Sequence, residues 1–132
     1  MSTEAATLPI LDALSMRVTL AGLRITRGPE PLYHVFFRIC LHNAAGFSVR
    51  LKGRKWLLQD SGGASRIIEA AQVFNQDPIL PPGAVFSCSG GQTFSRLPVN
   101  MEVRFFGEDQ WGRPFITPAL IFPRHCFRIP RA

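Results

Sequence analysis

Acidic residues are scarce in this sequence. Nine aspartates and glutamates stand against fifteen lysines and arginines among 132 residues, so the formal net charge is +6 and the pI is about 10.3. Thirteen of the basic residues are arginine, whose planar guanidinium holds carboxylate or phosphate groups and stacks on aromatic rings. This balance favours an acidic partner through long-range attraction, and it suits nucleic acid, an acidic protein surface or simple solubility about equally well.

Cysteines and long apolar runs are also few. The three cysteines, Cys40, Cys88 and Cys126, are odd in number and have no CxxC spacing. These counts argue against a disulfide framework or a zinc ribbon, and we expect a cytoplasmic location. The first residues offer only a short apolar run and no basic segment, so we expect neither a signal peptide nor a membrane partner.

Signatures of catalysis are missing as well. Ser87, Ser89 and His125 would suit a hydrolase, but the chain has no GxSxG sequence and no acidic residue placed to orient the histidine. The acidic residues show no paired spacing that would mark an acid/base couple. We therefore predict no enzyme, no catalytic residue and no cofactor.

One group of metal-ligating residue types occurs on a single predicted strand face. His34, Cys40 and His42 share the parity of an extended chain. Zinc or cobalt would need four such ligands, and the remaining candidates, His125 and Cys126, lie at the far end of the chain. An exposed strand face with a small apolar cysteine explains the pattern better, so we predict no metal site.

The feature present throughout is the alternation of apolar and other residues, which is typical of β-strands. Tyr33–Asn43 shows it most clearly and predicts a half-buried antiparallel strand. Further strands are predicted at 16–26, with a change of parity at Gly22, and at 47–60, 65–74, 85–89, 99–106 and 114–122. The chain is long enough for one domain, and we expect a flexible N-terminal arm at 1–14 and a single all-β antiparallel sandwich at 15–132.

The stretch that holds Trp56 is expected to be the central strand and the hairpin partner of Tyr33–Asn43. Val49 and Leu51 have one parity, whereas Trp56 and Leu58 have the other. One extra residue near positions 52–53 would bring both pairs to the same face, and a glycine is accepted in such a β-bulge. Trp56 is then predicted to anchor the core between two sheets.

Several motifs at matching spacing together resemble the ApaG domain over residues 16–123. They are Tyr33–Asn43, Val49–Trp56 with its Arg54-x-Trp56 element, Pro78–Gly83, Phe86 followed by Met101, and Gly112–Phe115. The resemblance implies a fibronectin type III or immunoglobulin-like sandwich. It also implies protein–protein interaction, in a small bacterial protein linked to magnesium and cobalt tolerance and in modules of eukaryotic F-box and polymerase-delta-interacting proteins.

The sequence departs from the family in a glycine-rich run that precedes the proline loop. Where members carry GxGxxG, this chain has Ala70, Gln72 and Asn75. Such a run holds a pyrophosphate only when small residues let the backbone approach it and a helix N-terminus faces it. Nucleotide binding through this loop is therefore less well supported here than in the family.

A partner-binding surface is expected at the densest basic cluster. We predict that Arg50, Lys52 and Lys55 contact an acidic surface of a protein partner and that Trp111, in a turn, is an apolar anchor. Edge strands at 16–26 and at the last strand, which Pro118 interrupts, could add main-chain pairing.

Two alternatives remain open. One is a small-ligand or divalent-cation protein that binds cobalt, magnesium or pyrophosphate. The other is single-stranded nucleic acid binding, in which basic groups hold phosphates and rings stack on bases. No recognised reader motif is present, so we expect a protein partner rather than nucleic acid.

Overall fold

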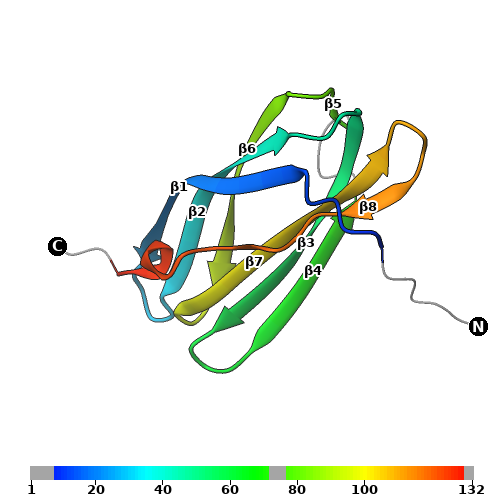
Figure 1. The fold of residues 1–132 in the computed structure, drawn as a ribbon. Helices are drawn as coiled ribbons and strands as arrows, with labels where there is room; N and C mark the ends of the chain where they lie inside the picture. Colours follow the sequence, from blue (N-terminus) through cyan, green and yellow to red (C-terminus); the bar gives the residue numbers. More distant parts are fainter. Residues whose placement is uncertain (1–7, 72–76, 130–132) are drawn as a thin grey trace, which may run out of the picture.

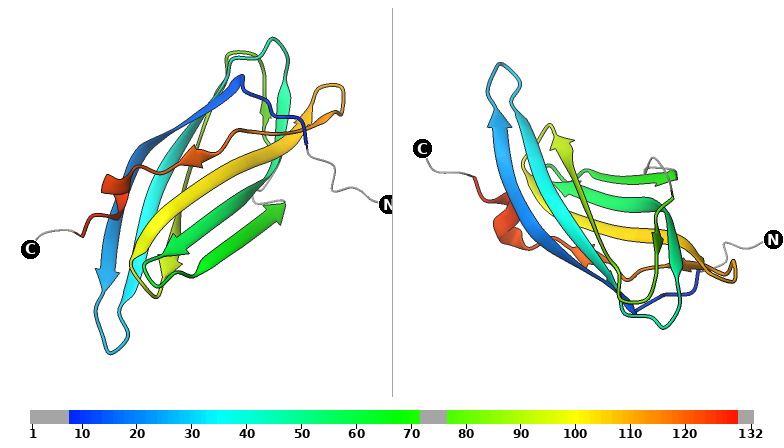
Figure 2. Two further views of the ribbon diagram at one scale, coloured as in Figure 1. Left: turned by 60° about the horizontal axis from the view of Figure 1, so that its bottom comes forward. Right: turned by 90° about the horizontal axis from the view of Figure 1, so that it is seen from above.

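Two β-sheets packed face to face make up the computed structural model, which describes residues 8–71 and 77–129 (Figures 1 and 2). The smaller sheet has the order β1-β2-β6, with β1 at Leu14–Thr26, β2 at Leu32–Asn43 and β6 at Val85–Phe94. The larger sheet has the order β4-β3-β7-β8, with β4 at Ser65–Ala71, β3 at Val49–Asp60, β7 at Pro98–Asp109 and β8 at Pro114–Ile116. The short strands β5 (Ile79–Leu80) and β9 (Leu120–Ile121) pair with β3 and β7, and the 3-10 turn η1 spans Arg124–Phe127. The predicted antiparallel β-sandwich is confirmed.

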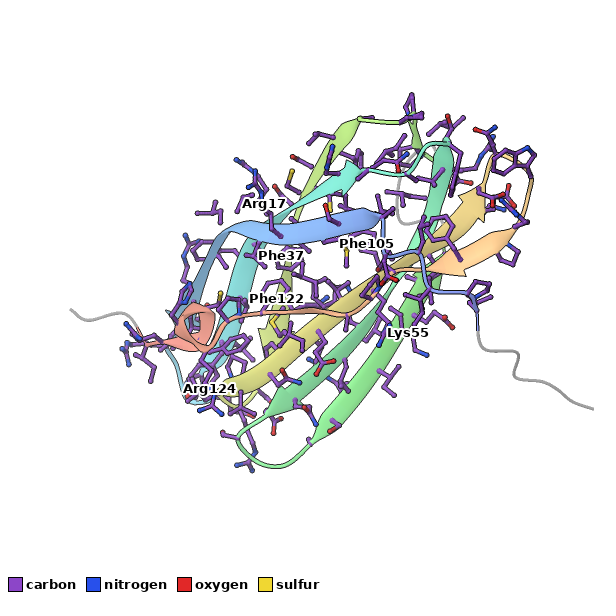
Figure 3. All side chains as sticks on the ribbon, viewed as in Figure 1. Arg17, Phe37, Lys55, Phe105, Phe122 and Arg124 are labelled. Carbon is purple, nitrogen blue, oxygen red and sulfur yellow. The ribbon has the colours of Figure 1, made fainter. Side chains whose placement is uncertain are left out.

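The core lies between the sheets and is centred on three aromatic rings. Trp56 is 3% exposed, and its ring centroid lies 5.1 Å from that of Phe37 and 5.8 Å from that of Phe122. Figure 3 shows Phe37 and Phe122 between the layers. Burying rings of this size contributes much of the hydrophobic stabilisation of a small sandwich. The prediction that Trp56 anchors the core is confirmed.

The predicted bulge in β3 is also confirmed. The register between β3 and β7 shifts between Leu51 and Gly53, so Lys52 is the extra residue. On either side of it, Leu51 and Trp56 both face the core, as a change of parity requires. β3 pairs with β4 and β7 and is therefore central.

The change of parity in β1 was predicted at the wrong residue. The register shifts between Val18 and Leu20 rather than at Gly22. Leu20 consequently lies on the outer face and is 51% exposed. Gly22 lies opposite Phe36, and a Cβ at this position would collide with the tip of the Phe36 ring. The glycine serves to admit a side chain of the neighbouring strand rather than to bend its own.

The expected hairpin between β2 and β3 is wrong, because the two strands belong to different sheets. Asn43, fully buried at the end of β2, holds the corner between them. Its Nδ2 donates to the carbonyl oxygens of Phe47 and Leu80, both at 2.9 Å, and its Oδ1 accepts from the Ala45 amide at 2.9 Å. The buried Asn43 side chain thus supplies hydrogen-bond partners to backbone groups of the loop that passes from one sheet to the other.

One further boundary differs from the prediction, and another falls outside the described residues. The strand expected to end at Ser89 continues as β6 to Phe94, because Gly90 leaves room for the Phe37 ring, 3.1 Å from where a Cβ would lie. The strand expected at 65–74 is β4 up to Ala71, and residues 72–76 lie outside the described part of the chain, including Gln72 and Asn75 of the altered glycine run.

Part of the segment expected to be a flexible arm, residues 1–14, is hydrogen-bonded to β8. Ile10 forms a parallel bridge with Ile116 of β8, the Leu11 amide donates to the Ile116 carbonyl, and the Ile116 amide donates to the Pro9 carbonyl, both at 2.9 Å. Leu14 is 1% exposed in the core. Residues 1–7 lie outside the described residues.

Each sheet has two edges. β1 and β6 are the edges of the smaller sheet, and the predicted last strand forms the short β8 and β9 beside β7 at one edge of the larger sheet. β4 is the other edge of the larger sheet, and the sequence did not indicate that β4 or β6 would be an edge. Among the described residues, no helix is long and apolar enough to cross a membrane.

Candidate functional site

Arg50, Lys52 and Lys55 lie on the outer face of the larger sheet, because the residues that alternate with them along β3 are buried. Arg50 is in register with Glu108 of β7. The Lys52 ammonium lies 3.3 Å from a carboxylate oxygen of the same glutamate. One carboxylate therefore offsets part of the positive charge at this end of β3.

Lys55 lies farther along β3 and has charged neighbours of both signs. It is in register with Glu69 of β4 on one side and with Arg104 of β7 on the other. Glu102 lies on the same face, two residues before Arg104. The cluster that reads as wholly basic along the chain thus becomes a surface of mixed charge in the sheet.

A groove of about 840 Å³ runs over this outer face. Lys55, Glu69, Glu102 and Arg104 supply its charged lining. Its apolar lining comes from four strands and from the segment before β1, and it includes Leu8, Ile10, Trp56, Leu57, Ile67, Phe106 and Ile116. An apolar floor with a few charged groups around it is the usual composition of a binding site.

Sequence reasoning missed the apolar members of the groove. Leu57 and Ile67 are paired across β3 and β4, and Ile67 is 68% exposed. The signal was present, since Leu57 follows Trp56 directly and Ile67 precedes Ile68. A strand with one buried face needs apolar residues at alternate positions only. Apolar residues at both parities therefore marked an outer surface suited to binding.

Trp111 lies apart from the three basic residues, at the tip of the hairpin between β7 and β8. Its side chain is 60% exposed. The ring centroid lies 5.4 Å from that of Phe47, and the Arg113 guanidinium carbon lies 4.7 Å from the Trp111 ring centroid. The ring is therefore held between two neighbours while it keeps most of its surface accessible.

Asp109 shapes the turn that presents Trp111. Its carboxylate accepts hydrogen bonds from the Trp111 amide at 2.9 Å and the Arg113 amide at 3.0 Å, and it pairs with the Arg113 side chain at 2.7 Å. Desolvation raises the pKa of Asp109, but these hydrogen bonds and the Arg113 charge outweigh it and hold the pKa below its ordinary value. Gly112, with φ of 79°, completes the turn.

Arg54 differs from the other basic residues of β3 because it faces the space between the sheets. It lies close to Cys88 of β6: burial raises the pKa of the Cys88 thiol, and the charge and hydrogen bond of Arg54 partly counteract this effect. The Arg54-x-Trp56 element thus points both of its defining side chains inward, so it is a feature of the interior rather than of the binding surface.

The candidate metal ligands are not brought together. His34 lies on the outer face of β2, where its ring nitrogens are 2.7 Å from the Thr26 hydroxyl and 3.1 Å from the Thr93 hydroxyl. Cys126 is buried in the core. Within residues 8–71 and 77–129, no three His, Cys, Asp or Glu side chains are grouped so that they could hold a metal ion.

Comparison with protein families identifies one match. The model of the ApaG domain matches residues 27–107, which is more than half of the chain. Protein ApaG of Acidovorax sp. (strain JS42) is 26% identical over 98 residues, covering 74% of this chain and 72% of the relative. Protein ApaG of Deinococcus radiodurans is 29% identical over 105 residues, covering 80% and 81%.

Solved structures resemble the fold at low sequence identity. The X-ray structure of structural genomics target SoR45 has a TM-score of 0.75 at 18% identity and covers 83% of this chain and 84% of the target. The crystal structure of the ApaA protein from Bordetella pertussis has a TM-score of 0.67 at 18% identity, with 86% and 94% covered. Both matches extend over both sheets and support the same sandwich.

Proposed function

This chain belongs to the ApaG domain family, and from that premise we propose that it is a non-catalytic module that binds a protein partner. The observation that carries the proposal is the groove on the larger sheet, with its apolar floor and charged rim. An extended segment of the partner would place apolar side chains against Leu57, Ile67 and Phe106. For extended segments, pockets for alternate side chains give specificity, while main-chain pairing gives affinity.

The partner segment would be acidic. Lys55 and Arg104 lie next to each other on adjacent strands in the groove lining, and the whole chain carries a net charge of +6. A carboxylate placed between these two side chains would meet two cations, and long-range attraction would speed the encounter. Arg50 and Lys52 add positive charge along β3, although Glu108 weakens their contribution, and Glu69 and Glu102 would keep partner carboxylates away from the other parts of the groove lining.

Trp111 supplies a second contact. Exposed tryptophan and arginine side chains are frequent energetic centres of protein interfaces, and here Arg113 stacks on the Trp111 ring. Ile10 lines both the large groove and a smaller hollow that Phe47 also lines. Phe47 in turn contacts Trp111, so a single partner could reach from the groove to the hairpin tip.

The positions of the candidate catalytic residues support a non-catalytic role. Ser87 and Ser89 lie on the outer face of β6, in register with outward-facing residues of β2. His125 lies in η1, which packs against β1 and β7. A nucleophile and its base must lie within hydrogen-bond reach, and no hydrogen bond joins His125 to either serine among the described residues.

The experiment that tests the proposal is site-specific photo-crosslinking. A benzophenone amino acid replaces Ile67 in the groove, and in a matched protein it replaces Leu20, an exposed apolar residue on the other sheet. Illumination in cells should yield a discrete protein adduct from position 67. The same adduct should weaken when Lys55→Glu is added, because a like charge would then repel the acidic segment.

Adducts of equal size and yield from both positions would contradict the proposal, as would the absence of any adduct from the groove. Two finer expectations belong to the same proposal: a cytoplasmic location, and a role in magnesium and cobalt tolerance exerted through the partner. Growth of cells carrying Lys55→Glu in graded cobalt would test the second.

A further inference from the structure

The outer face of the smaller sheet carries a second concentration of charge. Strand pairing places its outward residues in rows across β1, β2 and β6, about 7 Å apart along the strands. There are five such rows, listed from one end: Ser15, His42 and Val85; then Arg17, Cys40 and Ser87; then Leu20, Arg38 and Ser89; then Gly22, Phe36 and Gly91; then Arg24, His34 and Thr93.

The cationic side chains on this face are all arginines, and no acidic residue of the three strands offsets their charge. Among the residues of these three strands, all of which the structure describes, there is no aspartate or glutamate. The nearest acids along the chain, Asp12 and Glu30, flank β1 outside its strand residues. Arg17, Arg24 and Arg38 are all exposed, and Figure 3 shows Arg17 on this sheet. Their field is therefore positive along the whole face.

An exposed aromatic ring lies in the middle of the arginines. Phe36 is 37% exposed, and the glycines at its sides, Gly22 on β1 and Gly91 on β6, present no side chain. The ring leans across the sheet so that its tip lies over Gly22. The Arg24 guanidinium carbon lies 5.6 Å from the ring centroid. Because Arg24 lies over the ring, a base that stacks on Phe36 would displace the guanidinium, which could then stack on the same base.

A shallow hollow of about 290 Å³ lies at one end of the face. Ser15, Arg17, His42 and Cys40 contribute to its lining. Beside it, Arg38 donates a hydrogen bond from Nε to the Ser89 hydroxyl at 3.3 Å, which orients the guanidinium along the face. Hydroxyl and guanidinium groups are the usual contacts of phosphate oxygens.

We propose that the outer face of the β1-β2-β6 sheet binds single-stranded nucleic acid, with Arg17 and Arg38 on the phosphates and Phe36 stacked on a base. Sheets that bind single strands without strong sequence preference combine a basic surface with aromatic platforms in this way. A duplex would fit less well, because its base faces are covered by stacking. The site is independent of the groove on the larger sheet.

Charge complementarity alone would also accept an acidic polypeptide. Two observations favour the nucleic acid: the cations are all arginine, whose planar group suits phosphate and stacking, and the ring among them is 37% exposed and flanked by glycines on both strands. An acidic polypeptide has no planar group that needs this ring.

The test measures binding of fluorescein-labelled oligothymidylate by anisotropy over a range of salt concentrations. Arg17→Ala combined with Arg38→Ala should weaken binding at least about tenfold at low salt and reduce the slope of log K against log salt by about 1.4. Phe36→Leu should weaken binding at least about fivefold and leave the slope unchanged, since it removes stacking but no charge.

Matched variants on the opposite face serve as controls. Arg50→Ala combined with Lys52→Ala removes the same formal charge from the larger sheet, and Phe106→Leu removes the ring that leans over Gly53 there. Both should bind the oligonucleotide as the unchanged protein does. Equal weakening by the two double variants would overturn the proposal, because binding would then follow net charge alone.

Two further measurements keep the stacking claim testable. Phe36→Trp should retain affinity, and its added fluorescence should be quenched by the oligonucleotide; absence of quenching would overturn the placement of a base on this ring. Poly-L-glutamate should compete poorly. Suppose that poly-L-glutamate displaced the oligonucleotide when its carboxylates were as concentrated as the phosphates, and that Phe36→Leu left oligonucleotide affinity unchanged. The face would then recognise negative charge only, and the proposal would fail. Thermal melts of each variant confirm that it is folded.

Discussion

The two outer faces of this sandwich share a local device and differ in what surrounds it. On the smaller sheet the tip of Phe36 leans over Gly22, and on the larger sheet the tip of Phe106 leans over Gly53. Around Phe106 the surface is hollowed and carries both signs of charge. Around Phe36 it is shallow and carries arginines without an acid. The comparison teaches that a ring on the outer face of a sheet does not define a binding face by itself, because the neighbouring charges and the shape of the surface differ between the two.

The difference extends to how tightly each ring is held. A Cβ at Gly53 would collide with the backbone oxygen of Ala70 as well as with the Phe106 ring, whereas a Cβ at Gly22 would meet only the Phe36 ring. Backbone atoms held in a paired strand such as β4 move aside less easily than a side chain. We therefore expect the larger sheet to tolerate a side chain at Gly53 less well than the smaller sheet tolerates one at Gly22.

The largest expected effect concerns the core that supports both faces. Trp56→Ala should lower the free energy of unfolding by about 3–5 kcal/mol, since it removes a buried ring that contacts Phe37 and Phe122. Urea denaturation measures this. Trp111→Ala removes an exposed ring of the same size and should change stability by no more than about 0.5 kcal/mol. A loss below about 1 kcal/mol for Trp56→Ala would contradict the placement of the ring.

A smaller effect distinguishes the two glycines. Gly53→Ala should destabilise the protein by about 1–3 kcal/mol, because backbone on β4 blocks the added methyl group. Gly22→Ala should cost less than about 1 kcal/mol, since the Phe36 ring can rotate away. Chemical denaturation of both variants measures these two losses of unfolding free energy. Equal losses would contradict the expected difference between the two glycine positions.

The smallest effect is a pH dependence at the hairpin tip of the larger sheet, where Asp109 accepts hydrogen bonds and pairs with Arg113. The pKa of Asp109 in the folded state is below its ordinary value of 3.8. The ionised carboxylate therefore contributes stability at neutral pH. This contribution is lost as the pH falls from about 3.8, the pKa in the unfolded chain, through the lower pKa of the folded state.

Unfolding free energies of the unchanged protein and of Asp109→Asn, measured from neutral pH downward, test this expectation. The difference between them should shrink as the solution becomes acidic. A difference that stays constant with pH would mean that the Asp109 carboxylate does not stabilise the turn through its charge.

Much of the fold followed from alternation along the chain. The alternating apolar positions of β2 predicted a half-buried strand, and the parity change around Lys52 predicted the bulge that turns Leu51 and Trp56 to the same side. These features are local, because side chains of an extended chain point to opposite faces in turn. The exposed position of Trp111 followed equally from its place in a turn next to Gly112.

The candidate site could be predicted only in part. Lys55 was identified, but Glu69 and Arg104, its neighbours across the strands, come from other segments of the chain. The hairpin expected between β2 and β3 failed for a related reason: nothing in the link itself indicated that Asn43 would bond to Leu80. Contacts between distant segments depend on the order of strands in the sheets, which alternation does not encode.

By itself the sequence determined that the chain is an antiparallel β-sandwich of the ApaG type, that Trp56 is buried, and that its charge is positive. Only the tertiary structure decided how that charge is divided. It placed acids beside the lysines of β3 and left the arginines of β1 and β2 without them. The physical reason is that an electrostatic surface depends on distances in space, whereas the sequence orders charges along the chain.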